Sequence, residues 1–261
     1  MDAPAGRSAA VVIGGAGGIG GAVLQALVRD RPDLVPWITF HSDEASVREL
    51  AEHVPGLRWR RCDLARTGEL QALADDVRAS ASRVAVLAHV ALQPISGTLL
   101  ELGHEQVSRA VATSGVSLLA AVEAFDRLLQ PGAAVLYVTS MGARRVVPRY
   151  GAVAAAKAAG EALVIYLASE LAERGVRVNT ISAGPVPTKA AAAMVGPENL
   201  EAAMSAAALA SPRRRGLELV EVGEAARLVC SEAASGITGQ TLVVDGGVFT
   251  ELVLTPAQLQ R

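Results

Sequence analysis

The sequence is poor in aromatic residues, in cysteine and in lysine. Aromatic side chains make up 3% of the 261 residues, so the hydrophobic core has to be aliphatic, built mainly from alanine, valine and leucine. Cys62 and Cys230 lie far apart and match no pairing pattern, which predicts reduced, buried thiols in a cytoplasmic protein; no metal site is predicted. Lys157 and Lys189 are the lysines of a chain with 24 basic residues in total, so each of the two positions stands out.

The sequence also lacks an excess of charge and long apolar runs. A net charge of −2 argues against nucleic acid as the main partner, because neutralising phosphates requires a basic excess. The N-terminal segment has no apolar stretch typical of a secretory signal, and no uninterrupted run of about 18 apolar residues occurs. The sequence therefore predicts neither secretion nor a membrane partner.

Short apolar segments alternate with amphipathic segments along the whole chain. The segments expected to form strands are 9–15, 36–40, 57–63, 83–89, 133–140, 176–182 and 240–247. Strand and helix in alternation predict the α/β class, with a parallel sheet covered by helices on both faces. No composition break divides the chain, so we expect a single doubly wound domain over 1–261. Residues 1–8 and the tail after about Leu254 are expected to be loosely held or used in subunit contacts.

A glycine-rich turn follows the first expected strand. Gly14, Gly18 and Gly20 have the G-x3-G-x-G spacing, and a helical segment begins directly after them. Such a turn needs backbone angles open to glycine, and it lets the chain approach a pyrophosphate whose charge the helix N-terminus favours. The order strand, turn, helix predicts dinucleotide binding, with Gly15 and Ile19 in the same turn.

Residues after the next two strands are candidates for the adenosine end of the nucleotide. Asp63 is suited to bond an adenine amino group, with Leu64 beside it, or alternatively to cap a helix. The second strand ends without an acid for a ribose 2′-hydroxyl and without an arginine immediately after it for a 2′-phosphate. His41 and Ser42 are able to meet either group. We expect NADPH, with NADH as the alternative.

The stretch RYGAVAAAKAAG, residues 149–160, carries Tyr150 and Lys157 in an alanine-rich helical context. Seven residues correspond to about two helical turns, which return to nearly the same face. The spacing therefore predicts that the phenol and the ammonium face one crevice.

Several motifs together resemble the short-chain dehydrogenase/reductase family over nearly the whole chain. They are Gly14-x3-Gly18-Ile19-Gly20, Asp63, Lys157, VNTISAGPVPT at 178–188 and ITGQTLVVDGG at 237–247. The resemblance implies a Rossmann-type sheet of seven parallel strands, a nicotinamide cofactor and a homotetramer or homodimer. It also implies that Lys157 binds the nicotinamide ribose and that Pro185, Val186 and Thr188 hold the nicotinamide.

The chain departs from the common family pattern around the tyrosine. Most members have a tyrosine four residues before the lysine, where this chain has Val153. An Asn-Asn-Ala-Gly stretch is replaced by AHVA at 88–91, and a helix asparagine by Ser114. The Y-x6-K spacing of Tyr150 and Lys157 resembles the enoyl-acyl carrier protein reductase branch, in which many members have a further tyrosine where this chain has Ser140.

The longer spacing suits conjugate reduction. Hydride delivered to the β-carbon of an enoyl thioester places negative charge on an oxygen two carbons away, so the acid should stand farther from the nicotinamide. We expect Tyr150 to donate to the thioester carbonyl, Lys157 to bind the ribose and lower the proton affinity of nearby hydroxyls, and Ser140 to assist. The expected function is NAD(P)H-dependent reduction of an acyl thioester at its α,β double bond, with an acyl carrier protein or coenzyme A as the carrier of the acyl group.

Simpler interpretations exist for each of these residues. Tyr150 is able to pack the start of a helix, Lys157 to be a solvated lysine, and Ser140 to be an ordinary strand-end serine. His89 either touches the nucleotide or packs in the core, and His104 is expected to be exposed on a helix. A ketoreductase acting on a β-keto acyl intermediate is the alternative enzyme. A nucleotide-binding protein without turnover is the alternative of another class.

A segment rich in small residues, 187–216, lies where the family has its substrate lid. Of two arginine clusters, Arg144, Arg145 and Arg149 flank Tyr150, and the arginines at 213–215 follow the stretch of small residues. They are placed to meet a phosphopantetheine arm, a coenzyme A phosphate or an acidic carrier protein, or else to form a solvated rim.

Overall fold

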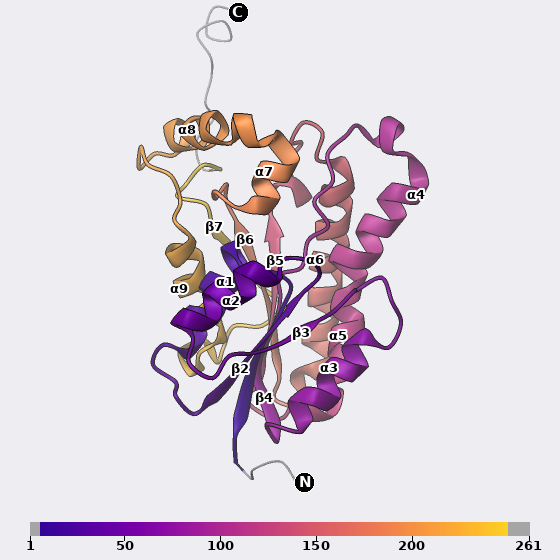
Figure 1. Ribbon diagram of the computed structural model, residues 1–261, viewed down its shortest axis with the longest axis vertical. Helices are drawn as coiled ribbons and strands as arrows, with labels where there is room; N and C mark the ends of the chain where they lie inside the picture. The colour runs from indigo at the N-terminus through magenta and orange to yellow at the C-terminus, as the bar shows by residue number, and fades with distance from the viewer. Residues whose placement is uncertain (1–5, 250–261) are drawn as a thin grey trace, which may run out of the picture.

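A computed structural model of the chain describes residues 6–249 (Figure 1). Its strands are β1 (Ser8–Ile13), β2 (Leu34–Phe40), β3 (Arg58–Arg61), β4 (Arg83–His89), β5 (Ala134–Ser140), β6 (Arg177–Ala183) and β7 (Thr241–Val244). Its α-helices are α1 (Gly18–Val28), α2 (Glu44–His53), α3 (Glu69–Arg78), α4 (Leu99–Val111), α5 (Ser117–Phe125), α6 (Gly151–Ala172), α7 (Lys189–Val195), α8 (Leu200–Ala210) and α9 (Leu219–Cys230).

The strands form one parallel sheet of seven in the order β3-β2-β1-β4-β5-β6-β7. The chain winds outward from β1 to β3 and then returns to start again at β4, beside β1. Because every strand is parallel, all carboxyl ends lie at the same edge of the sheet. A ligand crevice is expected outside that edge where the winding reverses, between β1 and β4.

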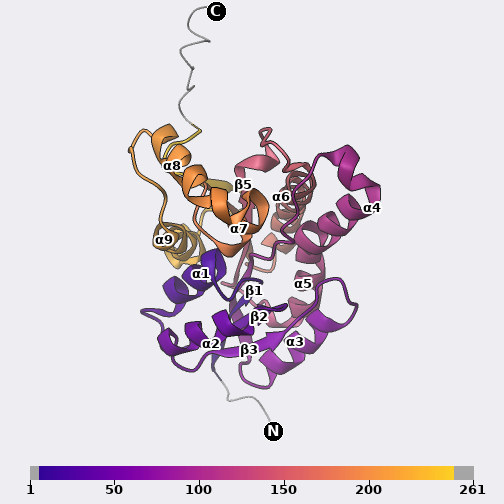
Figure 2. The same ribbon diagram turned by 45° about the horizontal axis from the view of Figure 1, so that its top comes forward.

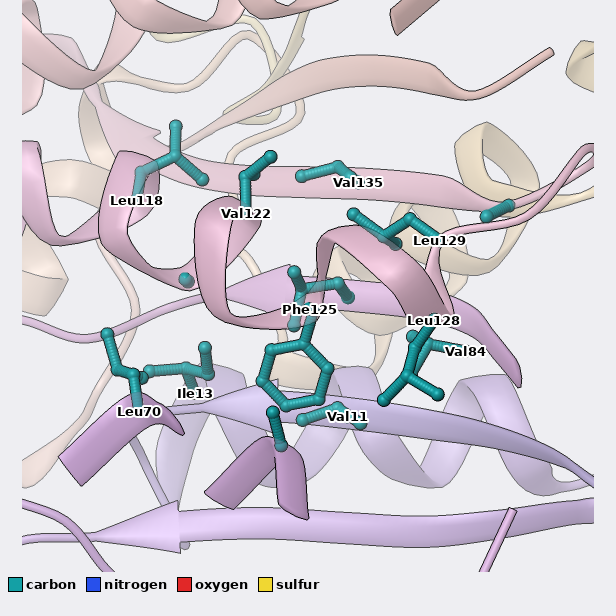
Figure 3. Close-up of a cluster of buried hydrophobic side chains, with 14 of the residues drawn as sticks. Val11, Ile13, Leu70, Val84, Leu118, Val122, Phe125, Leu128, Leu129 and Val135 are labelled. Carbon is teal, nitrogen blue, oxygen red and sulfur yellow. The ribbon is translucent and has the colours of Figure 1, made fainter. Parts of the chain in front are cut away.

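Helices cover both faces of the sheet, and each face has its own apolar core. On one face, α3, α5 and α6 pack on side chains such as Val11 and Ile13 of β1 around the fully buried Phe125 (Figure 3). On the other face, α1, α2 and α9 pack on the alternate residues Ala10 and Val12. A strand buried on both sides reads as an unbroken apolar run, which is why the central strands are easy to see in the sequence.

The predicted strands correspond to the observed ones, with differences at the ends. The turn residues Gly14 and Gly15 lie beyond the end of β1. The edge strands β3 and β7 are shorter than predicted, because half-exposed positions at the edge of a sheet carry no apolar pattern that marks where the strand ends. The segment expected to be loose begins outside the described residues at 1–5, but Ser8 is already part of β1, so that boundary was wrong. The tail after Leu254 lies outside the described residues.

Two helical stretches are long and apolar enough to cross a membrane by length and composition alone, Leu99–Leu128 and Gly151–Ala172. The sequence analysis found no such stretch because polar residues interrupt the apolar ones. Both stretches pack against the sheet, as core helices do, and α4 is bent at Gly103, whose φ is 69°.

Candidate active site

A cleft of about 1240 Å³ opens at the carboxyl edge of the sheet. The glycine turn before α1, the loop after β2 and the ends of β5 and β6 form its floor, and Lys157 of α6 with the residues 147–150 before that helix line one wall. Residues of α7 and α8 also line the cleft, and α7 lies between α9 and α6 (Figure 2). Met194 and Met204 of these two helices face the cleft, as expected for part of the segment 187–216.

The glycine turn is built to approach an anion closely. Gly15 and Gly18 have φ of +88° and +59°, which other residues rarely adopt, and a Cβ on Gly20 would overlap the carbonyl oxygen of Gly15. Gly17 caps α1 without any side-chain hydrogen bond, so no side chain competes for the first N–H groups of the helix. The predicted Gly15, Gly18 and Ile19 line the cleft.

Gly14 has a different task. Its N–H donates to Thr39 Oγ1 at 2.9 Å, and a side chain there would overlap Ala91, beyond the end of β4. Gly14 is absent from the cleft lining and instead lets β1 and the segment after β4 approach each other.

The loop after β6 closes over the glycine turn. Pro185, Val186 and Thr188 all line the cleft, as predicted. Thr188 caps α7 by accepting a hydrogen bond from the N–H of Ala191 at 3.0 Å, and a Cβ on Gly18 would lie 2.8 Å from the Thr188 methyl group. The start of the segment 187–216 therefore rests directly on the glycine turn.

Tyr150 and Ser140 form a hydrogen-bonded pair in the cleft. Ser140 ends β5 and Tyr150 immediately precedes α6, and the Tyr150 hydroxyl lies 2.9 Å from Ser140 Oγ. The Tyr150 ring lies against Gly142, where a Cβ would overlap it. Burial raises the pKa of Tyr150, with the Ser140 hydrogen bond as a smaller opposing effect, so the phenol is protonated at neutral pH.

Lys157 lies in the same cleft and is 3% exposed. Its ammonium donates to the Ala91 carbonyl oxygen at 3.2 Å and lies 4.9 Å from the centre of the Tyr137 ring. Burial lowers the pKa of Lys157 to about 7. Val153, at the position where most family members have their tyrosine, is fully buried in the core.

A buried polar cluster stands behind Lys157. His89 is fully buried, its Nε2 lies 2.8 Å from Ser117 Oγ, and its ring is 5.6 Å from that of Tyr137. The Tyr137 hydroxyl donates to the Ser114 carbonyl oxygen at 2.7 Å. Burial, and secondarily the Lys157 charge, lower the pKa of His89 to about 3, so it stays neutral. His89 does not line the cleft. Its fully buried position agrees with the expectation that it packs in the core rather than touching the nucleotide.

The predicted adenosine residues divide into two groups. His41 and Ser42 line the cleft directly after β2. Asp63 and Leu64 do not: the Asp63 carboxylate accepts the Ala65 N–H at 3.0 Å within a turn, and Leu64 packs on the core. Asp63 is not a helix cap either, because α3 begins six residues later, at Glu69, with Gly68 as its N-cap.

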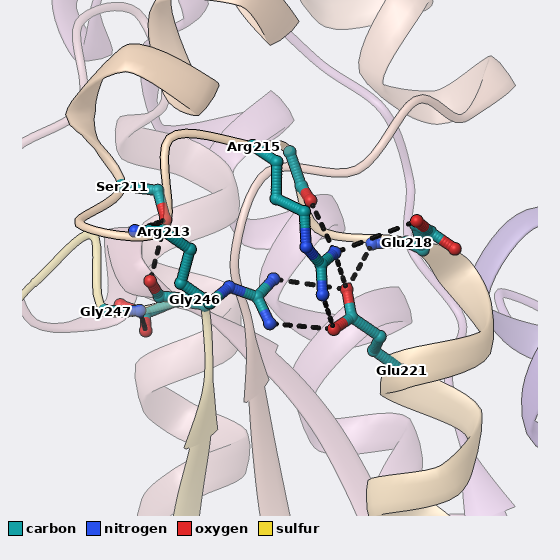
Figure 4. A network of polar contacts seen from close by, with 9 residues as sticks. Ser211, Arg213, Arg215, Glu218, Glu221, Gly246 and Gly247 are labelled. Atoms are coloured by element: carbon teal, nitrogen blue, oxygen red, sulfur yellow. Dashed lines mark hydrogen bonds and ion pairs between the residues drawn. The ribbon is translucent and has the colours of Figure 1, made fainter.

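Ion pairs neutralise most arginines that were considered for an anionic substrate arm. Arg213 and Arg215 both bind Glu221 of α9 at 2.8 Å, which ties the end of the lid segment to that helix (Figure 4). Arg144 pairs with Glu161 at 2.9 Å, and Arg149 with Glu101 at 3.3 Å. This rim is a network of internal pairs rather than a field of free positive charge. His104 is exposed on α4, as expected.

The sequence analysis missed three groups at the site. Thr139 lines the cleft beside Ser140, and its buried hydroxyl has no hydrogen-bond partner within residues 6–249. Tyr137 supports Lys157, and the Ala91 carbonyl accepts from it. Side chains alternate along β5, so Tyr137 and Thr139 lie on the same face of the strand, the face covered by α6. This alternation is the sequence pattern from which the two residues could have been predicted.

Comparison with known sequences leads to the same class of protein as the residues of the cleft. The family model described as enoyl-(acyl carrier protein) reductase matches residues 14–249. The chain is 33% identical over 208 residues to the NADH-dependent enoyl-acyl carrier protein reductase FabI of Nostoc sp., covering 78% of this chain and 80% of that one. It is 30% identical to an NADH-dependent enoyl-acyl carrier protein reductase of Rhizobium meliloti, covering 82% and 79%.

Solved structures agree with these sequence matches. An enoyl-acyl carrier protein reductase of Aquifex aeolicus superimposes with a TM-score of 0.82 at 27% identity, over 95% of this chain and 98% of that one. The actinorhodin polyketide ketoreductase with NADPH has a TM-score of 0.83 at 24% identity over 94% and 98%, a likeness of fold. Within the short-chain dehydrogenase/reductase fold, this chain belongs to the enoyl-(acyl carrier protein) reductase family.

Proposed function

We propose that this protein reduces the α,β double bond of an acyl thioester with a nicotinamide dinucleotide. The observation that carries the proposal is the position of the Tyr150 hydroxyl, hydrogen-bonded to Ser140 in a cleft that Lys157 also lines. The proposal agrees with the family and with the reaction named for the relatives.

The residues of the cleft fit a dinucleotide. The turn at Gly15 and Gly18 and the uncapped start of α1 fit the pyrophosphate, and Lys157 is placed to donate to ribose hydroxyls. The unpartnered hydroxyl of Thr139 marks polar space still to be filled at the end of β5. When bound, the nicotinamide supplies the hydride.

The protein residues then handle the charge that appears on the thioester oxygen. Tyr150, whose pKa is raised by burial, holds its proton and donates a hydrogen bond to that oxygen. Ser140 fixes the orientation of the phenol through the 2.9 Å hydrogen bond. Met194 and Met204 supply an apolar cover that excludes water from the acyl chain.

The substrate is proposed to arrive on an acyl carrier protein in the cytoplasm, and the chain to assemble as a homotetramer or homodimer. For the cofactor we propose NADPH in preference to NADH, because β2 ends without an acid directly at its end to accept a ribose 2′-hydroxyl.

Two thioesters distinguish the proposed reaction from ketone reduction. With NADPH and the full-length protein, crotonyl thioester should make the cofactor absorbance in the near ultraviolet fall, whereas acetoacetyl thioester should leave it constant. The reverse result would assign a ketoreductase. Nucleotide binding without oxidation by either thioester would leave only a binding protein.

The proton donor is tested by Tyr150→Phe. Removing the hydroxyl should lower turnover about 10²- to 10⁴-fold, the usual contribution of a positioned acid, while nucleotide affinity stays unchanged. Tyr166→Phe is the matched control, because Tyr166 is a tyrosine on α6 that is 70% exposed. Equal activity of the two variants would remove Tyr150 from the mechanism.

A further inference from the structure

Arg61 lies beside the loop after β2, next to His41 and Ser42 of the cleft, although it is itself absent from the cleft lining. It is the last residue of β3 and stands in register with Phe40, the last residue of β2. Its Nε donates to the carbonyl oxygen of His41 at 3.0 Å. This bond holds the guanidinium beside the loop in which His41 and Ser42 line the cleft.

Arg61 differs from the two other arginines of β3. Arg60 is paired with Asp76 at 2.5 Å, and the Arg58 guanidinium lies 5.9 Å from the centre of the Trp37 ring. Arg61 is exposed, and within residues 6–249 it has no acidic partner within 4.0 Å. Its two terminal nitrogens make no hydrogen bond to the described residues, so the planar end of the side chain is available to a ligand.

The acid nearest to this loop in sequence is already occupied. The carboxylate of Asp43 accepts the Ser46 N–H at 3.2 Å and the Ser46 hydroxyl at 2.8 Å. It also binds the Lys189 ammonium at 2.6 Å. These contacts hold the pKa of Asp43 below its usual range, and they engage its carboxylate with partners inside the protein.

We propose that Arg61 binds the 2′-phosphate of NADPH and thereby determines the cofactor preference of this chain. A guanidinium matches a phosphate through two parallel hydrogen bonds, a geometry that an ammonium or an imidazole does not offer. His41 and Ser42 stand next to the same group as secondary contacts. The inference rests on the dinucleotide cleft of the proposed function, and it separates this chain from the relatives named as NADH-dependent.

The test measures binding without turnover. Full-length protein is titrated by calorimetry with 2′,5′-ADP and with 5′-AMP, which differ by the 2′-phosphate alone. The unmodified protein should bind 2′,5′-ADP roughly tenfold to hundredfold more tightly, the range expected for charge-assisted hydrogen bonds. Arg61→Gln should remove this difference and leave the affinity for 5′-AMP unchanged. The difference should also shrink with added salt, because the site is exposed.

Arg58→Gln is the matched control on the same strand and should retain the full preference. Arg61→Lys keeps the positive charge but lacks the planar guanidinium that makes two parallel hydrogen bonds, so it should retain only part of the preference. This variant replaces Arg61→Gln if the latter does not fold. Equal affinities for the two ligands in the unmodified protein would overturn the inference, and so would a preference that survives Arg61→Gln. Failure of the thioester assay alone leaves this titration unaffected, so the two proposals fail separately.

Discussion

At the scale of single residues, the most unusual group is the ammonium of Lys157, which is buried without an acidic partner among the described residues. Burial disfavours its charged form, and the one hydrogen bond to the Ala91 carbonyl compensates only in part. The neighbouring His89 is neutral and adds no charge of its own. In the nucleotide-free protein Lys157 therefore reduces stability in its protonated form.

The cost of burying the charged form of Lys157 predicts that the free energy of unfolding depends on pH. The amine has a pKa of about 7 in the folded protein and an ordinary value of 10.5 in the unfolded chain. Between these values the unfolded chain binds more protons, so the free energy of unfolding rises with pH, by at most about 1.4 kcal/mol per unit. The stabilisation is complete above 10.5 and is lost as the pH falls to about 7.

Urea unfolding of the nucleotide-free protein at several values between about pH 7 and 9 measures this slope. Lys157→Met should flatten the curve. A slope that is the same in the variant would mean that Lys157 keeps an ordinary pKa. The thiol of Cys62, whose pKa burial raises from 9.0 to about 11, acts in the opposite direction above this range.

Sequence reasoning was successful for residues whose role follows from local spacing. Tyr150 and Lys157 are about two helical turns apart, and both face the cleft as the period of the helix predicts. Asp63, predicted to meet the adenine, lies outside the cleft lining, and Arg61 was not singled out from the sequence. Both positions depend on the register of β2 against β3 and on which hydrogen bonds are already made, and these are contacts between distant segments that one sequence does not display.

At the scale of secondary-structure elements, α6 packs closely on β5 because Gly160 leaves room for the Tyr137 ring. A Cβ at Gly160 would overlap that ring, and the Tyr137 hydroxyl is also bound to the Ser114 carbonyl, so the ring has no easy way to move. Gly160→Ala should therefore lower the free energy of unfolding by about 1–3 kcal/mol.

Denaturant unfolding measures this cost, and a second substitution identifies its cause. In the Tyr137→Leu background, Gly160→Ala should cost clearly less, because the group it meets has been removed. Gly236→Ala is the control, since a Cβ there would have nothing within 4 Å. An equal cost in both backgrounds would mean that the ring does not determine how α6 is seated.

The clip between the lid segment and α9 is a second element-scale feature. Glu221 accepts from Arg213, from Arg215 and from the N–H of Glu218 at 2.9 Å, and these contacts strongly lower its pKa (Figure 4). Glu221→Gln should increase amide hydrogen exchange at 211–218 while global stability falls by less than about 1 kcal/mol, because such pairs are partly exposed.

Glu105→Gln is the control for that substitution, because it removes a surface ion pair on α4, far from the lid in the sequence. Unchanged exchange at 211–218 in Glu221→Gln would mean that the clip does not hold the lid segment.

Elements were predictable in proportion to their burial. Central strands such as β1 are apolar throughout and were recognised with nearly correct ends. The edge strands β3 and β7 expose much of their surface, so their ends were overestimated. The two arginine clusters were visible as charge, but their acidic partners, Glu161, Glu101 and Glu221, could be assigned only once the helices were placed.

At the scale of the whole molecule, two apolar cores share one sheet and should unfold together. Phe125 is fully buried in the centre of one core (Figure 3). Phe125→Ala should reduce the free energy of unfolding by about 3–5 kcal/mol and still give a single transition, because the strands carry both cores. Tyr166→Ala, at a position that is 70% exposed, should change stability little.

Circular dichroism and tryptophan fluorescence followed through the same transition provide the measurement. Two separated transitions would mean that the faces of the sheet are independent units. The doubly wound architecture itself was predictable, because alternation of strand and helix leaves few parallel arrangements once crossovers are right-handed. How the lid lies over the glycine turn was not, since alanine-rich segments carry little directional pattern.

The ion pair between Asp43 and Lys189 is a contact through which salt acts on one place in the molecule. It joins the loop after β2 to the first residue of α7, two segments 146 positions apart, and its lysine side chain is 77% exposed. Dissolved ions weaken such a contact first. Raising the salt concentration should therefore speed the escape of a bound nucleotide before it affects the fold, so that the length of time the cofactor stays bound becomes tunable by the medium alone.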